Sequence, residues 1–137
     1  MTQLRGLLPH GGAMVMLDEV VSHDPAGIVC RSMRHLDPAN PLRHAGRLPA
    51  LAGIEFCLQA AALHGGLLAG TAQRPGYVAS LRAVTLHVDR LDDPALTCLV
   101  VEAAREAQEP SVMSYALTLR AESRLLLTGR ALIKLPA

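Results

Sequence analysis

A single carboxylate, Glu55, interrupts a long apolar segment of the sequence. It is the only formally charged residue between Arg47 and Arg74, where Leu, Ala and Gly predominate. A charge in apolar surroundings is costly without a partner, and it is useful where a reaction needs an acid or a base. Glu55 is therefore the first candidate for a catalytic group. A structural carboxylate, hydrogen-bonded within the fold or across an interface, is the alternative.

Two further polar residues, Gln59 and His44, could assist this carboxylate. Gln59 follows Glu55 by four residues, so the two side chains would share one face of a helix. An amide does not titrate, so we expect Gln59 to orient Glu55 or a backbone group. His44 lies in a loop before the apolar segment, and imidazole is a common general base near neutral pH. A solvent-exposed loop histidine is the alternative for His44.

The apolar segment itself predicts a buried helix over residues 49–69. Pro49 suits a first helical turn, and Gly70 followed by Pro75 supplies the stop. Apolar residues point in almost every direction around this helix, which is typical of a helix buried on all sides. Small residues share the face of Glu55 and leave room for a ligand, whereas His64 points the other way. These small residues are Ala52, Ala62 and Gly66.

Six segments are predicted to be strands around this helix. Two of them precede it and are expected to form a hairpin, and a loop over residues 36–47 then leads into the helix. The strand segments are residues 14–21, 28–35, 77–88, 95–106, 112–121 and 125–135. This order predicts a single α+β domain spanning residues 1–137, with a curved antiparallel sheet of five to six strands wrapped around one long central helix. That is the hotdog fold, whose exposed sheet edge favours a homodimer.

The bulk composition excludes several classes of function. A net charge of +1, no Trp and one Phe give no basis for a nucleic-acid surface or a polybasic membrane contact. The three cysteines form no CxxC pair and are expected to be buried thiols of a reducing, cytoplasmic protein. The N-terminus lacks the pattern of a signal peptide. The apolar segment is long enough to span a membrane, but its polar residues and four glycines argue against that reading.

Metal and nucleotide cofactors are also not expected. The six histidines lack metal-ligand spacing, and no phosphate-binding glycine motif occurs.

Two blocks of the sequence resemble the 3-hydroxyacyl-acyl-carrier-protein dehydratases. Residues 7–20 read LLPHGGAMVMLDEV and are similar to the opening of that family, a Leu-Pro-His followed by a strand. Residues 48–59 read LPALAGIEFCLQ and resemble its central-helix signature, with Pro, Glu and Gln at matching spacing. The strand predicted after the helix also fits, so the resemblance covers most of the chain.

The resemblance implies a reaction and roles for particular residues. In that family a loop histidine removes the C2 proton of a 3-hydroxyacyl thioester, and a helix carboxyl of the partner subunit assists departure of the hydroxyl. It thus implies Glu55 as the acid and His44 as the base, with His10 near the site as a supporting or substitute group. Backbone groups at the helix start, near Pro49, Ala50 and Leu51, would contact the thioester oxygen. No metal or cofactor is implied.

The loop before the helix departs from the family pattern. The family has His-Phe-Pro-Gly ahead of a Pro-Gly, whereas residues 44–50 read HAGRLPA, which brings the histidine three residues closer to the glutamate. Ala50 replaces the second glycine. This departure resembles a shorter branch of dehydratase-like hotdog proteins, such as those encoded with aryl-polyene-type biosynthetic genes, in which the loop histidine is often not retained.

The resemblance also implies partners and leaves alternatives open. Arg43, Arg47 and Arg74 flank the helix and are expected to contact an acyl carrier protein or the phosphate of its pantetheine arm, with a plain solvated surface as the alternative. We expect dehydration to a trans-2-enoyl thioester in fatty-acid or polyene-type biosynthesis. A non-catalytic subunit that binds acyl chains or joins an active dehydratase in a hetero-oligomer is a second reading. An acyl thioesterase in which Glu55 activates water is a third.

Overall fold

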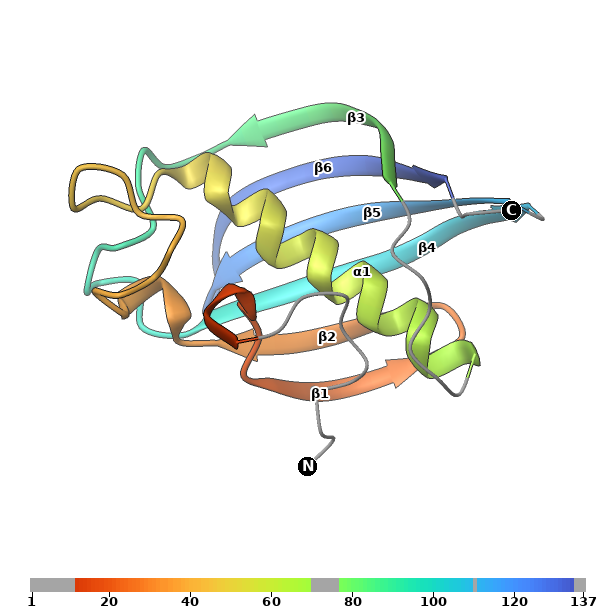
Figure 1. Ribbon diagram of the computed structural model, residues 1–137, viewed down its shortest axis with the longest axis horizontal. Coiled ribbons are helices and arrows are strands. Elements are labelled where there is room, and N and C mark those ends of the chain that lie inside the picture. Colours follow the sequence, from red (N-terminus) through yellow and green to blue (C-terminus); the bar gives the residue numbers. More distant parts are fainter. Residues whose placement is uncertain (1–11, 70–76, 110, 135–137) are drawn as a thin grey trace.

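A six-stranded antiparallel sheet and one long helix dominate the computed structural model, which describes residues 12–69, 77–109 and 111–134. The sheet has the order β1-β2-β4-β5-β6-β3. Its strands are β1 Glu19–Asp24, β2 Gly27–Ser32, β3 Tyr77–Leu86, β4 Leu99–Glu109, β5 Val112–Ala121 and β6 Arg124–Lys134. Helix α1, Gly53–Ala69, lies diagonally across one face of the curved sheet (Figure 1). This arrangement confirms the predicted α+β hotdog fold.

Apolar side chains fill the space between α1 and the sheet. Phe56, Cys57 and Leu63 on the helix are fully buried. Strand β5 meets them with alternating burial, and its inward residues are Met113, Tyr115, Leu117, Leu119 and Ala121. Burying one large apolar side chain stabilises a fold by about 1.5–3 kcal/mol. Residues 50–68 are apolar and long enough to cross a membrane. Their packing against the sheet accounts for this apolar composition, because they form the core helix.

The central helix begins with a tight turn. Residues Ala50–Ala52 form a 3-10 helix that continues into α1, and Pro49 lies just before it in an extended conformation rather than inside the first turn. Gly53, the first residue of α1, packs closely on the sheet. A Cβ atom there would lie 2.7 Å from Cδ2 of Leu119 and 3.3 Å from Cδ1 of Leu127.

The first strand starts later in the chain than the predicted residues 14–21. Gly12–Met14 forms a 3-10 turn, and β1 begins only at Glu19. Met16 makes hydrogen bonds with side chains instead of a neighbouring strand: its N–H donates to Oε1 of Gln59 at 2.8 Å, and its carbonyl accepts from Oγ of Ser32. These side chains satisfy the backbone groups that a strand ladder would otherwise pair.

Two other predicted boundaries also shift, while both predicted hairpins are confirmed. Residues 34 and 35, expected at the end of the second strand, lie instead in a 3-10 turn over Arg34–Leu36. Strand β4 begins at Leu99 rather than residue 95, because Asp93 accepts hydrogen bonds from the N–H groups of Ala95 and Leu96 and so turns the chain. Strand β1 pairs with β2, and β5 pairs with β6.

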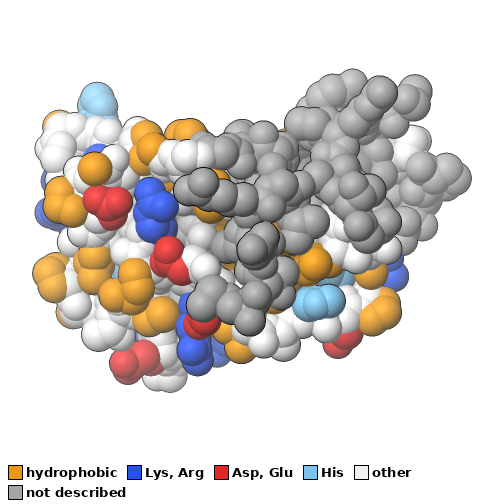
Figure 2. Space-filling view, turned by 60° about the horizontal axis from the view of Figure 1, so that its bottom comes forward, with side chains coloured by type: hydrophobic (Ala, Val, Ile, Leu, Met, Phe, Trp, Pro, Cys, Tyr) orange, Lys and Arg blue, Asp and Glu red, His pale blue; other side chains and the backbone are white. Residues whose placement is uncertain are grey.

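Charged side chains of both signs are scattered over the face drawn in Figure 2. There the blue and red side chains of the described residues stand among orange apolar ones and do not gather by sign. A nucleic-acid surface would instead concentrate Lys and Arg. This face therefore agrees with the near-neutral net charge of the sequence.

Candidate active site

Glu55 lies on the side of α1 that the sheet does not cover. The partly exposed residues of the helix fall on this side, whereas Ile54, Phe56 and Cys57 are buried. Its neighbours there are Leu51, Ala52, Leu58 and Ala62. The carboxylate is therefore half-buried in an apolar surface, with the small side chains of Ala52 and Ala62 on the same side of the helix.

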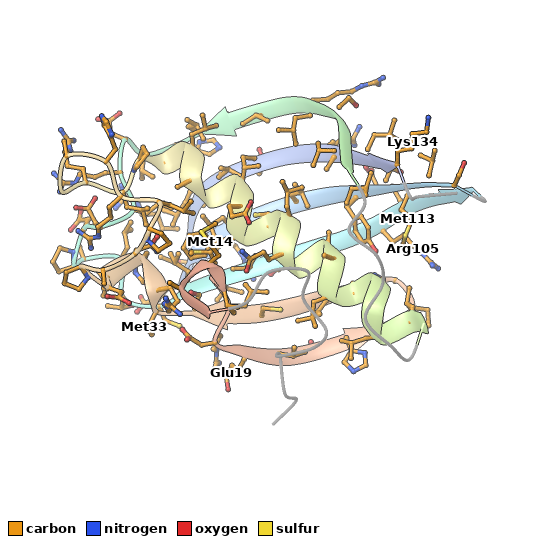
Figure 3. All side chains as sticks on the ribbon, in the orientation of Figure 1. Met14, Glu19, Met33, Arg105, Met113 and Lys134 are labelled. Atoms are coloured by element: carbon orange, nitrogen blue, oxygen red, sulfur yellow. The ribbon has the colours of Figure 1, made fainter. Side chains whose placement is uncertain are left out.

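Gln59 links Glu55 to the backbone that precedes β1 through three hydrogen bonds. Its Nε2 donates to Oε1 of Glu55 at 3.0 Å and to the carbonyl of Met14 at 2.7 Å, while its Oε1 accepts from the N–H of Met16 at 2.8 Å. Figure 3 shows Met14 beside the helix. A flipped amide would face a carbonyl with an oxygen and an N–H with an amino group, so the orientation of Gln59 is determined. Gln59 thus contacts both a backbone segment and Glu55.

A backbone donor lies one helical turn before Glu55. The N–H of Ala50 already donates to the carbonyl of Asp89 at 3.0 Å, and that of Ala52 donates to the carbonyl of Pro49. Within the described part of the chain, no acceptor is found for the N–H of Leu51. Of the two amides considered from the sequence, that of Leu51 is therefore the one available to a ligand oxygen, at the positive end of the helix.

Asp92 holds the loops that lead into this helix. It accepts from the N–H of Leu48 at 3.1 Å and from Nε of Arg90 at 2.9 Å, and it pairs with Nη1 of Arg43 at 3.7 Å. The hydrogen bonds from Arg90 hold the pKa of this nearly buried carboxyl well below its usual range, and the Leu48 N–H acts in the same direction. Asp92 is not among the residues predicted from the sequence, and its spacing of two residues from Arg90 is the one local signal for this pair.

Arg43 is committed to the structure of the same loop. Its guanidinium donates to the carbonyls of Asp37, Gly46 and His35 at 2.9, 3.2 and 3.3 Å. Most of its donors are therefore used within the chain. Of the other two arginines for which a carrier contact is predicted, Arg47 is exposed, and Arg74 lies outside the described residues.

His44 occupies a small exposed hairpin. Its N–H donates to the carbonyl of Arg47 at 2.7 Å, and the N–H of Arg47 donates back at 3.0 Å. Ala45 and Gly46 between them have φ values of 51° and 76°, as a tight two-residue turn requires. No hydrogen bond or ion pair of the imidazole is found among the described residues. His10, the other candidate histidine, lies outside them.

Two histidines outside the site are buried and neutral in character. His64 on α1 contacts the hydroxyl of Tyr115 through Nδ1 and the carbonyl of Asp24 through Nε2, both at 2.8 Å. Nε2 of His35 contacts the carbonyl of Leu96. Burial lowers the pKa of both imidazoles and raises that of Tyr115 to about 12. These residues join the helix and the loops to the sheet, on the side away from Glu55.

The thiols and acidic groups of the described residues offer no evident metal site. No group of three His, Cys, Asp or Glu side chains in this part of the chain could hold a metal ion. Cys30 and Cys57 are buried, and burial raises the pKa of each thiol to about 12. Such thiols are unreactive near neutral pH.

Comparison with known proteins places these features in a family. The fold is that of a hotdog protein. Residues 2–136 match the ApeP-like family model, described as ApeP dehydratase, and the chain belongs to this family. This result confirms the resemblance to dehydratase-like hotdog proteins. A search of curated proteins gives no significant match.

Solved structures share the fold at low sequence identity. One is the dehydratase heterocomplex ApeI:P from Xenorhabdus doucetiae, with 21% identity, a TM-score of 0.86, and coverage of 100% of this chain and 93% of the other. A second is AziG from S. sahachiroi, with 16% identity, a TM-score of 0.62, and coverage of 87% and 91%. A hypothetical thioesterase with coenzyme A from Streptococcus pneumoniae TIGR4 has 13% identity, a TM-score of 0.62, and coverage of 87% and 85%.

Proposed function

We propose that this chain is a subunit of a cytoplasmic dehydratase that converts a 3-hydroxyacyl thioester of acyl carrier protein into the trans-2-enoyl thioester. Fatty-acid or polyene-type biosynthesis would use this product. The observation that carries the proposal is the position of Glu55, held by Gln59 at 3.0 Å on the open side of α1, one turn from the available N–H of Leu51. Membership of the ApeP-like dehydratase family supports the reaction class.

The proposed chemistry follows from what each group can donate. A base removes the C2 proton, and the electron pair moves onto the thioester oxygen, which the N–H of Leu51 stabilises. The enolate then expels the C3 hydroxyl, to which protonated Glu55 gives a proton, so that water leaves and the C2–C3 double bond forms. The base ends protonated and Glu55 ends ionised. A proton must return from one to the other before the next turnover.

The base and a second subunit complete the proposal. His44 stands on an exposed hairpin, which suits a group that reaches toward Glu55 of a neighbouring subunit, and His10 is the substitute. The homodimer expected from the sequence and a hetero-oligomer both supply such a neighbour. The heterocomplex of the structural relative supports an assembly of hotdog subunits. Arg47, assisted by Arg43 and Arg74, would meet the carrier protein or its phosphate.

A non-catalytic subunit is the second candidate function. The observation in its favour is the short loop that carries His44 in a tight turn, with no described contact that would orient the imidazole. In this reading, the apolar side of α1 binds the acyl chain, and an associated hotdog subunit performs the chemistry.

Incubation with a 3-hydroxybutanoyl thioester, on both carrier protein and coenzyme A, tests these readings. If Glu55 is the catalytic acid, the rate of enoyl formation, followed by its absorbance, should fall at least about 100-fold in the Glu55→Gln variant. Release of free thiol would identify a thioesterase instead. The non-catalytic role predicts three results together. The chain alone gives no product, an added hotdog dehydratase subunit restores it, and the Glu55→Gln variant supports the same restored activity.

The matched control is Glu19→Gln. Glu19 is also a partly exposed carboxylate, paired with Arg31 at 3.3 Å on the sheet, away from the helix. Its substitution removes the same charge and should leave enoyl formation unchanged. Equal losses in both variants would contradict a specific role for Glu55.

A further inference from the structure

A cleft of about 630 Å³ lies beyond the end of β3, beside the segment that leads into α1. Three parts of the chain line it: the loop before α1, the end of β3 with the loop that follows, and the start of β6. Figure 1 shows all three at the same end of the sheet. The volume is within the range of small-molecule sites, about 300–1,000 Å³.

Backbone hydrogen bonds join the walls of this cleft. The N–H of Ala50 donates to the carbonyl of Asp89 at 3.0 Å, which ties the segment before α1 to the loop after β3. The N–H of His87 donates to the carbonyl of Leu126 at 2.9 Å, which ties the same loop to β6. The cleft is therefore formed by hydrogen-bonded backbone, and a ligand can bind there without first ordering a loop.

Two arginines of the cleft have no ion pair within the part of the chain that the structure describes. Arg47 and Arg124 are both exposed, and they approach the cleft from different segments. The third arginine, Arg90, differs because Asp92 accepts hydrogen bonds from its guanidinium and neutralises its charge. Two positive charges therefore line the cleft without a protein counter-ion. They match the charge of a phosphate monoester near neutral pH, and guanidinium groups bind phosphate oxygens well.

The other side chains of the cleft indicate what the ligand carries besides phosphate. Asp89 is exposed and forms no ion pair with the arginines among the described residues. Asp93 accepts a hydrogen bond from the N–H of Ala95 at 2.9 Å and is engaged in that turn. Both carboxylates repel a bare phosphate ion, whereas a hydroxyl or amide N–H on the ligand would donate to Asp89. Leu86 and Val88 supply apolar surface for the organic part.

We propose that this cleft binds an organic phosphate, with the phosphate between Arg47 and Arg124 and a hydroxyl or amide group of the same molecule donating to Asp89. Two sources share this chemistry: the pantetheine arm of a carrier protein and the nucleotide end of coenzyme A. The choice between these sources rests on the proposed function, whereas the phosphate site itself does not.

Isothermal titration calorimetry at low salt tests the proposal with three probes: inorganic phosphate, phosphopantetheine and adenosine 3′,5′-bisphosphate. At least one organic phosphate should bind more tightly than inorganic phosphate, and the tighter of the two identifies the source. Its addition should shift the NMR signals of the His87 side chain, which lines the cleft. No binding of either organic phosphate at millimolar concentration would overturn the proposal.

Two substitutions locate the ends of the bound molecule. Arg124→Gln should weaken the organic phosphate about tenfold, as expected for the loss of a hydrogen bond to a charged group. Asp89→Ala should also weaken the organic phosphate, but inorganic phosphate should bind as tightly as before or more tightly, because a repelling carboxylate is gone. Unchanged binding of the organic phosphate in either variant would contradict the proposed site.

Arg31→Gln is the matched control for Arg124→Gln. Arg31 is an exposed arginine on β2 that pairs with Glu19 at 3.3 Å and does not line the cleft. Its substitution removes the same charge and should leave the affinity unchanged, so equal losses in both variants would mean general attraction of anions and no site. If Arg124→Gln does not fold, Arg47→Gln replaces it with the same expectation. Binding is measured without turnover, so a failed dehydratase assay leaves this test intact.

Discussion

Gln59 donates a hydrogen bond of 3.0 Å to Glu55 and at the same time bonds the backbone of Met14 and Met16. One side chain thereby joins the two sequence blocks that resemble the dehydratase family. The backbone of Met14 and Met16 orients the side-chain amide of Gln59, and this amide donates a hydrogen bond to the carboxylate of Glu55. Because Gln59 is 2% exposed, solvent cannot replace these bonds without local opening.

Replacing Gln59 with Ala should therefore reduce both stability and activity. The N–H of Met16 and the carbonyl of Met14 would lose their partner, and an unsatisfied buried polar group costs about 1–3 kcal/mol. The free energy of unfolding in urea should fall by at least that amount. In the proposed reaction kcat should fall more than KM rises, since Glu55 would lose the hydrogen bond from Gln59 without losing its surroundings.

Leu58→Ala is the matched control for Gln59→Ala. Leu58 is the preceding residue on the helix and is only partly buried, so its truncation removes apolar contacts and no hydrogen bond. Its effect on kcat should be small. A Gln59→Ala protein with unchanged stability would show that these hydrogen bonds contribute nothing to the fold.

Asp92→Asn should destabilise the protein near neutral pH by about 1.5–3 kcal/mol, the range for a hydrogen bond to a charged group. The folded-state pKa of Asp92 is depressed, chiefly by Arg90. Its stabilisation is therefore present above the unfolded pKa of about 3.9 and is lost as the pH falls below that value. Urea denaturation at pH 7 and pH 3 should show a smaller difference between variant and parent at pH 3 than at pH 7, and the difference should vanish only below the depressed folded pKa. Equal differences would contradict the assignment.

Only those features of the fold and the site that depend on neighbouring residues can be predicted from the sequence. The helix over residues 49–69 follows from its apolar composition and its Pro49 and Gly70 signals, strand β5 follows from the turn residues that bound it, and the i,i+4 spacing of Glu55 and Gln59 predicts their shared face. The pairing of β3 with β6 does not follow, because it joins segments about 50 residues apart in the chain. The conformation of residues 14–18 does not follow from the sequence either. Their apolar residues resemble a strand, but the backbone of Met16 forms hydrogen bonds with the side chains of Gln59 and Ser32.

His64 should make the protein less stable in mild acid. Burial lowers its folded pKa, with Arg105 and His23 acting in the same direction and the Asp24 carbonyl and carboxylate opposing them. The folded state favours the neutral imidazole, so stability is complete above the unfolded pKa of about 6.5 and declines as the pH falls below it. Urea denaturation between pH 7.5 and pH 5 should show this decline, with His35 contributing in the same window.

Substitution of His64 separates its share of this decline from that of His35. His64→Gln should flatten the pH dependence between pH 7.5 and pH 5, whatever its effect on absolute stability. Tyr115→Phe removes the hydroxyl that contacts Nδ1 of His64 and should lower stability at pH 7.5 while keeping a pH dependence. A His64→Gln protein that retains the full parental slope would contradict the role of His64.

Gly53→Ala should test the close approach of α1 to the sheet. Ala is ordinarily a better helix residue than Gly by about 1 kcal/mol, so propensity alone predicts stabilisation. The added Cβ would lie 2.7 Å from Leu119 Cδ2, and Leu119 is fully buried and cannot swing into solvent. Overpacking of this kind costs about 1–3 kcal/mol, so the net change in unfolding free energy should be a loss. Gly46→Ala, at φ 76° with no atom within 4 Å of the new Cβ, should lose about 1 kcal/mol through backbone strain alone. A gain in stability for Gly53→Ala would mean that the helix can move off the sheet, and Glu55 with it.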